Sequence, residues 1–200
     1  MGDLKYDRVA IEDYLAIERE DNRRYEYIDG ELFGMAGGTG THTRIASNLH
    51  SAIGNALYDK GTCEYMNTDA KVEIASSRRY VYPDGLIACP IAKESNTLTG
   101  AFTNPRVIFE VVSESSMEYD FVTKRKFYAS VPTVREYVIV SQTTASIIVY
   151  SRENADDRFT VSDITGLESE LFLRSIEVSI SLSRIYHNVD FPKPKTDKKA

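Results

Sequence analysis

Residues 83–89 read Pro-Asp-Gly-Leu-Ile-Ala-Cys and residues 107–112 read Val-Ile-Phe-Glu-Val-Val, so two acidic side chains lie inside apolar sequence. A charged group is costly to bury without a partner, and each acid therefore needs one in the folded protein. We interpret Asp84 and Glu110 as two ligands of one divalent metal ion.

Glu110 occupies a pattern typical of a central strand, where glutamate is almost never fully buried unless it is paired. The alternative is a salt bridge to a buried arginine, such as Arg106 or Arg135. Asp84 follows Pro83, which has no amide hydrogen and marks a strand entrance or a bulge. Such a position can turn a side chain toward a site. The alternative for Asp84 is a turn in which it faces water.

The chemistry of this pair favours magnesium. Two adjacent carboxylates cannot both ionise comfortably unless a cation lies between them. Mg²⁺ prefers oxygen ligands at about 2.0–2.1 Å and usually takes one or two carboxylates plus water and phosphate. Asp84, Glu110 and the backbone carbonyl of Val111 would meet that requirement.

Lys124 lies one helical turn after Asp120 and one before Tyr128, so the three can share a helix face. In the functional interpretation Lys124 points toward the metal, where it orients the attacking water or stabilises charge on a phosphate. In the alternative, Asp120 and Lys124 form a solvated ion pair of about 0.3–0.5 kcal/mol, with Tyr128 packed behind it.

Two accessory residues extend the candidate site. Glu26 alternates with Tyr25 and Tyr27 in a hairpin strand, where it either joins the acidic site or only forms the polar face of the strand. His42 follows a glycine-rich segment at the start of a long helix, and its alternative is a helix-end histidine without a task. The spacing leaves both alternatives open.

The composition is that of one ordinary domain. The chain has 200 residues, 42% hydrophobic and 27% charged, and we expect a single domain over residues 1–190. Residues 191–200 are basic and contain proline, which predicts a disordered tail. The net charge of −6 argues against clamping nucleic acid by bulk charge, although a carboxylate-bound cation reverses the sign locally.

The same sequence predicts a cytoplasmic protein with no membrane partner. No apolar run approaches the roughly 20 residues that span a bilayer, and the N-terminus has acids where a signal peptide has a basic start. The two cysteines, Cys63 and Cys89, are too few for a disulfide framework and have no metal-ligand spacing. We therefore expect reduced thiols.

Hydrophobic periodicity and turn residues predict the secondary structure. Helices are expected at 8–20 with Asp7 as N-cap, at 41–60 between a Thr41 cap and Gly61, at 119–130 and near 181–186. Strands are expected in a hairpin over 24–36 that turns at Asp29-Gly30, and at 63–75, 80–89, 106–113, 135–141, 146–151 and 158–162. Residues 90–105 are expected to form a loop.

The order of these elements predicts an α/β fold. The three strands before helix 119–130 have no helices between them and should be antiparallel. Strand 135–141 follows a helical crossover and should lie parallel to an earlier strand. The expected core is therefore a mixed β-sheet, an antiparallel meander plus a parallel strand, flanked by helices.

The chain resembles the "putative restriction endonuclease" domain family of the PD-(D/E)XK nuclease superfamily over roughly residues 10–187. The residues that carry the resemblance are 25–31, His42, 82–84, 109–113, 120–128 and 134–137. The resemblance implies a restriction endonuclease-like core, Mg²⁺ or Mn²⁺ chemistry on DNA, and Asp84 and Glu110 as the metal carboxylates. It also implies a homodimer.

One position departs from the superfamily pattern. The usual lysine falls two residues after the acid, where this chain has Val112. In the family that the chain resembles, a lysine from the following helix stands in, and Lys124 matches that position.

Three functions are compatible with these residues. The first is a metal-dependent endonuclease in which Asp84 and Glu110 hold the metal and Lys124 assists the attacking water. The second is a catalytically silent nuclease fold that serves as a binding module, which the acidic balance and the displaced lysine motivate. The third is a hydrolase of another phosphodiester such as RNA, because the sequence does not separate these substrates.

Overall fold

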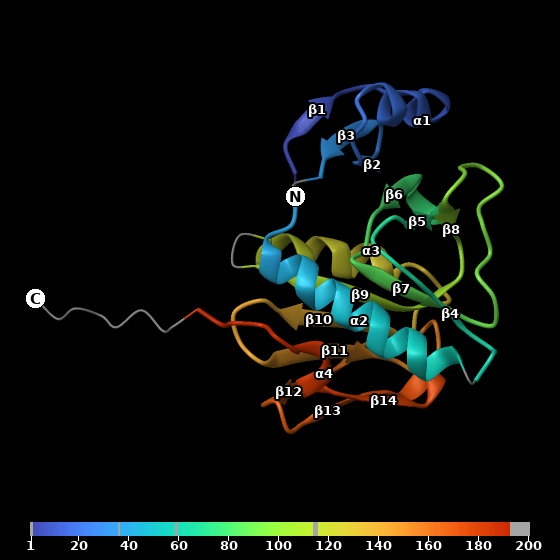
Figure 1. Ribbon diagram of the computed structural model, residues 1–200. Coiled ribbons are helices and arrows are strands. Elements are labelled where there is room, and N and C mark those ends of the chain that lie inside the picture. The colour runs from blue at the N-terminus through green and yellow to red at the C-terminus, as the bar shows by residue number, and fades with distance from the viewer. Residues whose placement is uncertain (1, 36, 59, 114–115, 193–200) are drawn as a thin grey trace, which may run out of the picture.

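A computed structural model describes residues 2–35, 37–58, 60–113 and 116–192 of the chain (Figure 1). Within these residues the strands form two six-stranded sheets and one two-stranded hairpin. We call the sheet that contains β9 and β10 the central sheet, and the sheet that contains β2 and β3 the N-terminal sheet. Both sheets are mixed, so the structure has the predicted α/β class with antiparallel and parallel strands.

The central sheet has the strand order β12-β11-β10-β9-β7-β4. Its strands are β4 (Glu64–Met66), β7 (Gly85–Ala88), β9 (Pro105–Val112), β10 (Glu136–Ser141), β11 (Ser146–Ser151) and β12 (Thr160–Thr165). Strands β9 and β10 are parallel, and the other neighbouring pairs are antiparallel. The π-helix η2 (Tyr119–Lys124) and the helix α3 (Arg125–Ala129) connect the parallel pair, so the expected crossover is confirmed.

The N-terminal sheet has the order β1-β3-β2-β6-β5-β8. Its strands are β1 (Leu4–Tyr6), β2 (Tyr25–Ile28), β3 (Glu31–Gly34), β5 (Lys71–Ile74), β6 (Arg79–Val81) and β8 (Ala101–Phe102), with the short helix η1 (Ala75–Ser77) between β5 and β6. The expected hairpin of β2 and β3 is confirmed. Asp29 and Gly30 adopt the positive φ values, 54° and 94°, that a tight turn requires.

Helix α1 (Ile11–Glu20) covers the N-terminal sheet through Tyr14, which packs among buried tyrosines of β2 and β6. The helix begins three residues later than expected. Its N-cap is Ala10, which makes no side-chain cap, so the predicted cap at Asp7 is wrong.

Two strands that the sequence predicts as continuous are each divided between the sheets. Expected strand 63–75 becomes β4 and β5, and expected strand 80–89 becomes β6 and β7. The second break falls at Tyr82-Pro83-Asp84, where proline cannot donate a ladder hydrogen bond. Asp84 therefore lies where the chain passes from one sheet to the other.

Both faces of the central sheet are covered by other elements. Successive side chains of a strand point to opposite faces, so neighbouring residues of β9 pack against different elements. On one face Phe109 packs against Leu49 and Ile53 of the long helix α2 (Gly40–Tyr58), which crosses the sheet in Figure 1. On the other face Ile108 packs with Tyr128 of α3 and with strands of the N-terminal sheet. The burial of β9 on both sides explains its continuous apolar sequence.

The C-terminal hairpin was not predicted from the sequence. It consists of β13 (Glu170–Leu173), the short helix η3 (Arg174–Ile176) and β14 (Val178–Ser181), and the expected short helix follows as α4 (Leu182–Ile185). Phe191, which the sequence assigns to the tail, packs edge-on against Tyr186 with ring centroids 5.3 Å apart. Residues 193–200 lie outside the described part of the chain.

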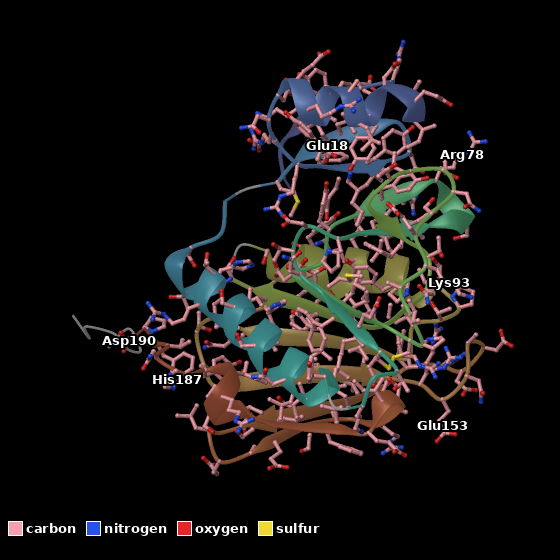
Figure 2. All side chains as sticks on the ribbon, turned by 45° about the vertical axis from the view of Figure 1, so that its right-hand side comes forward. Glu18, Arg78, Lys93, Glu153, His187 and Asp190 are labelled. Atoms are coloured by element: carbon pink, nitrogen blue, oxygen red, sulfur yellow. A yellow bond between two sulfur atoms is a disulfide. The ribbon has the colours of Figure 1, made fainter. Side chains whose placement is uncertain are left out.

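Cys63 and Cys89 form a disulfide, which Figure 2 draws in yellow. They flank the paired residues Glu64 and Ala88 of the antiparallel strands β4 and β7, which brings them face to face. The expectation of reduced thiols is therefore wrong, and with it the thiol argument for a reducing compartment. No described helix is long and apolar enough to cross a membrane, and the cytoplasmic location stays a prediction.

Leu49→Ala tests how far the fold depends on α2. Leu49 is 0% exposed, and the truncation leaves a cavity, so we expect the free energy of unfolding in urea to fall by about 2–5 kcal/mol. Asn55→Ala on the exposed face of the same helix is the matched control and should change it by less than about 0.5 kcal/mol. Equal effects of the two changes would contradict this packing.

Candidate active site

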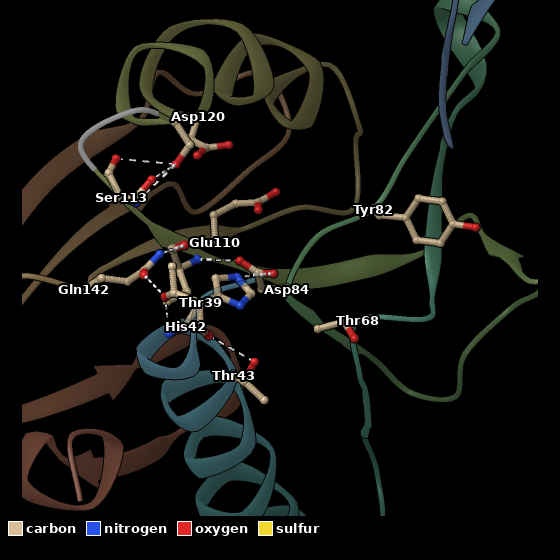
Figure 3. A network of polar contacts seen from close by, with 12 residues as sticks. Thr39, His42, Thr43, Thr68, Tyr82, Asp84, Glu110, Ser113, Asp120 and Gln142 are labelled. Carbon is tan, nitrogen blue, oxygen red and sulfur yellow. Dashed lines mark hydrogen bonds and ion pairs between the residues drawn. The ribbon is translucent and has the colours of Figure 1, made fainter. Parts of the chain in front are cut away.

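Asp84 is fixed by three contacts at the point where the chain changes sheets (Figure 3). Its amide donates to the carbonyl of Phe109 (3.0 Å), and its Oδ2 accepts a hydrogen bond from the amide of Val111 (2.7 Å). Its Oδ1 lies 2.9 Å from Nε2 of His42. Since Gly85 pairs with Phe109 on β9, Asp84 lies beside Glu110 on the adjacent strand.

His42 reaches Asp84 because it stands in the first turn of α2. The helix begins at Gly40, and the hydroxyl of Thr39 accepts a hydrogen bond from the amide of His42 (3.1 Å). Thr39 is therefore the cap, and the predicted cap at Thr41 is wrong. A Cβ at Gly38 would lie 2.5 Å from Nδ1 of His42, so the glycine leaves room for the imidazole.

A short relay joins the start of α2 to β9. The Thr39 hydroxyl donates to Oε1 of Gln142 (2.9 Å), and Nε2 of Gln142 donates to the carbonyl of Val111 (3.1 Å). Gln142 directly follows β10, the parallel neighbour of β9. The relay orients the carbonyl that the sequence suggests as a metal ligand.

Lys124, the last residue of η2, places its ammonium among acids from β9, from β2 and from η2 itself. Nζ lies 3.0 Å from Oε1 of Glu110, 3.1 Å from Oε1 of Glu26 and 3.9 Å from Oδ1 of Asp120. It also donates to the carbonyl of Tyr82 (3.1 Å). The lysine thereby connects the central sheet, the N-terminal sheet and the crossover helix.

Two tyrosines complete the contacts of these acids. The hydroxyl of Tyr128 donates to Oε1 of Glu110 (2.8 Å), and the hydroxyl of Tyr119 donates to Oε2 of Glu26 (2.9 Å). Glu26, Glu110 and Lys124 are all buried. Their partners are the ones expected of buried charges, which are costly unless paired and hydrogen-bonded.

Except for the fully buried Tyr128, these residues line an open cleft of about 850 Å³. Lys124 and the acids Glu26, Asp84, Glu110 and Asp120 occupy one wall, and the start of α2 with His42 forms another. Polar and small side chains continue the lining away from the acids, including Ser47, Ser51, Asn67 and Thr68. The volume of the cleft lies within the range of about 300–1,000 Å³ that is usual for small-molecule sites.

Residues 11–183 match the family model "Uma2: Putative restriction endonuclease". The chain belongs to this family. The resemblance predicted from the sequence is therefore confirmed, and so is the assignment to a family named for nucleases.

Relatives and a solved structure agree with the family. The uncharacterized protein slr1290 of Synechocystis sp. is 31% identical over 187 residues, 93% of this chain and 95% of the relative. The uncharacterized protein sll1609 of the same organism is 29% identical over 173 residues, 86% and 93% of the two chains. A crystal structure described as a putative nuclease of DUF820 from Anabaena variabilis superposes on this chain with a TM-score of 0.61. The match covers 82% of this chain and 90% of the other at 12% sequence identity, so it shows a shared fold.

Four carboxylates and one ammonium give the site an excess of negative charge. Burial raises the pKa of Glu110 well above its usual range; Lys124 opposes this shift, and Asp120 and Asp84 reinforce it. Burial also raises the pKa of Asp120, again against the influence of Lys124. Burial opposes the charged form of Lys124, but Glu110 and Glu26 outweigh it and raise the pKa of the lysine. A cation is therefore the ligand that this cluster favours.

His42 responds to the same field. Burial acts against the imidazolium, but the hydrogen bond and negative charge of Asp84 prevail and raise the pKa of His42. Asp84 thus favours the charged form of its imidazole partner.

The oxygen atoms of the site are of the kind that a hard divalent cation prefers. Among the described residues, no three His, Cys, Asp or Glu side chains form a metal cluster on their own. Mg²⁺ needs only one or two carboxylates with other oxygen ligands, which Asp84, Glu110 and the Val111 carbonyl supply. A carbonyl oxygen has two lone pairs, so the bond from Gln142 leaves one of them for a metal.

In the described part of the chain, the structure does not contain the non-functional contacts that we considered for Glu110 and Lys124. Glu110 has Lys124 as its cation, and Arg135 instead donates to backbone carbonyls. The Asp120–Lys124 pair exists but is buried, so it is not the solvated pair of the alternative interpretation. Glu26 and His42 both join the acidic cluster. The catalytic and metal-binding roles of all these residues stay predictions.

Sequence reasoning missed two members of the site. Gln142 gave a usable signal, because it follows the end of β10, and ligands of α/β sheets gather at the carboxyl ends of parallel strands. Tyr119 gave none, since nothing local in the sequence shows that its hydroxyl meets Glu26, 93 residues away.

Lys124→Met tests whether the ammonium holds the cluster together. Removing one partner of a buried ion pair leaves uncompensated charge, so we expect the free energy of unfolding to fall by about 3–5 kcal/mol in urea titrations. Lys126→Met, at an exposed position of α3, is the control and should change it by less than about 0.5 kcal/mol. Adding Glu110→Gln to Lys124→Met should recover part of the loss. If the lysine change costs no more than the control, the cluster is not held by this ion pair.

Proposed function

We propose that this protein is a metal-dependent endonuclease that hydrolyses DNA phosphodiester bonds with Mg²⁺ or Mn²⁺. The observation that carries the proposal is the convergence of Asp84, Glu110 and Lys124 in one open cleft, from segments that are separate in the sequence. Membership of a family named for restriction endonucleases supports the reaction class.

Asp84, Glu110 and the carbonyl of Val111 would hold the metal. When bound, the ion supplies positive charge for the phosphate and a route to nucleophilic water near neutral pH. The amide of Val111 and the imidazole of His42 hold the two oxygens of Asp84 in place. Gln142 fixes the Val111 carbonyl. His42 and Gln142 are thus positioning residues.

Lys124 replaces the lysine that the superfamily carries two residues after the acid. The residue at that position, Val112, is 3% exposed and fills the core between the central sheet and α3. Glu110 and Val112 point to the same face of β9, and η2 covers that face. Lys124 therefore approaches Glu110 from the helix, where its ammonium can orient water or stabilise charge on the phosphate.

Cleavage assays with matched variants test the proposed catalytic roles. We expect Asp84→Asn and Glu110→Gln each to lower Mg²⁺-dependent cleavage of supercoiled and linear DNA by at least about 10²-fold, because each removes charge on which the metal depends. Glu118→Gln, an exposed change near the start of η2, should cleave like the natural protein. Circular dichroism checks that the variants fold. Activity that survives both changes would refute the assignment, and an RNA substrate in parallel identifies the polymer.

Calorimetry with Mn²⁺ tests the metal site without reference to activity. We expect saturable binding at millimolar or lower metal, which Asp84→Asn and Glu110→Gln remove and Glu118→Gln retains. The carboxylate oxygens are the ligands that such a cation needs. A folded natural protein that binds no Mn²⁺ would instead support the silent binding module. The homodimer also stays a proposal, and sedimentation of the purified protein tests it.

A further inference from the structure

A second cavity, of about 570 Å³, has no described lining residue in common with the active-site cleft. Its lining includes five arginines: Arg106, Arg135, Arg152, Arg158 and Arg174. Arg106 precedes Glu110 by four residues on β9, which is about 13 Å along a strand. The second cavity is therefore separate from the acidic cluster.

Two of the arginines are held rigidly by backbone carbonyls. The guanidinium of Arg152 donates to the carbonyls of Val134 (2.9 Å), Val131 (2.8 Å) and Ala129 (3.0 Å). Arg135 donates to the carbonyl of Pro132 (2.7 Å). Carbonyls satisfy the donors but carry no net charge, so the positive charge of this pair is not neutralised by them.

The acids of the cavity are engaged elsewhere. Glu136 is buried, and its two oxygens accept bonds from the amides of Arg174 (2.9 Å) and Ser175 (3.1 Å). Asp157 accepts from the amide of Asn154 (2.8 Å). Glu153 projects outward, as Figure 2 shows. Within the described part of the chain, none of the five arginines forms an ion pair.

Arg106 supplies an independent sign of a missing partner. Its Nε is buried and lacks a hydrogen-bond partner among the described residues. Its carbonyl accepts a hydrogen bond from the amide of Arg135 (2.8 Å), the residue just before β10, so the two arginines lie side by side. Burial first, and then the charge of Arg135, lowers the pKa of Arg152, while Asp156 and Asp157 oppose this shift.

We propose that this cavity binds a phosphate-monoester dianion carried by a nucleotide-sized molecule. Five arginines and three acids give the lining a formal charge of +2, which matches a dianion. Guanidinium groups recognise phosphate through paired N–H donors, and a terminal phosphate presents oxygens to several arginines at once. The volume lies within the range of about 300–1,000 Å³ that is usual for small-molecule pockets.

Titration calorimetry with AMP and with inorganic phosphate tests the proposal. The titrations contain EDTA, so that no metal in the acidic cleft captures the phosphate. We expect saturable binding to the natural protein and about tenfold weaker binding to Arg106→Gln and to Arg174→Gln, since each loses charge-assisted hydrogen bonds. Arg19→Gln, at an exposed position of α1, is the charge-matched control and should bind normally. Thermal unfolding without ligand checks each variant.

Oligonucleotides distinguish the two sources of a terminal phosphate. A strand with a 5′-phosphate that binds tighter than its 5′-hydroxyl counterpart, in an Arg174-dependent way, assigns the cavity to nucleic-acid ends. Binding of AMP alone assigns it to free phosphorylated molecules. The proposal is overturned if neither phosphate nor AMP binds at millimolar concentration, or if Arg19→Gln weakens binding as much as Arg174→Gln.

Discussion

The ammonium of Lys124, buried between Glu110 and Glu26, is the contact on which the site depends. Each of its partners belongs to a different part of the fold: β9 of the central sheet, β2 of the N-terminal sheet and the crossover helix itself. Buried charges are tolerated only when they are paired and hydrogen-bonded. The ion cluster therefore requires both sheets and η2 to meet in one arrangement.

This arrangement also explains how several acids can lie close together in one cleft. Lys124 and His42 give the carboxylates partners within the protein. Burial, reinforced by Asp120 and Asp84, keeps the pKa of Glu110 raised against the influence of Lys124. A bound cation would complete the balance. The fold thus holds the carboxylates in place with an excess of negative charge, which agrees with the proposed binding of a divalent ion.

The sequence predicted most of the central sheet, because its signals are local. The alternating and continuous apolar runs give β9, β10 and β11, and the Asp29-Gly30 turn gives the N-terminal hairpin. The division of strands 63–75 and 80–89 between two sheets could not be predicted, since it depends on which distant strands lie alongside. The same holds for the pairing of Cys63 with Cys89, where the two residues are brought together only by the register of β4 and β7.

The site shows the same division between local and distant information. Asp84 and Glu110 could be found because charge inside apolar sequence requires a reason. The position of Lys124 on a helix after β9 could be read from spacing, but its burial could not. Glu26 and His42 were ambiguous, because only the tertiary structure shows that β2 and the start of α2 face the same cleft.

The contact between Tyr119 and Glu26 spans 93 residues of sequence. During synthesis on the ribosome, Glu26 of the N-terminal sheet therefore has no such partner until the chain has been extended past the crossover helix. Bringing such distant residues together costs conformational entropy before the stabilising contacts between them can form. A nascent chain that ends before Tyr119 and Lys124 therefore cannot assemble the ion cluster, and the two sheets cannot be joined by it until the crossover helix has been made.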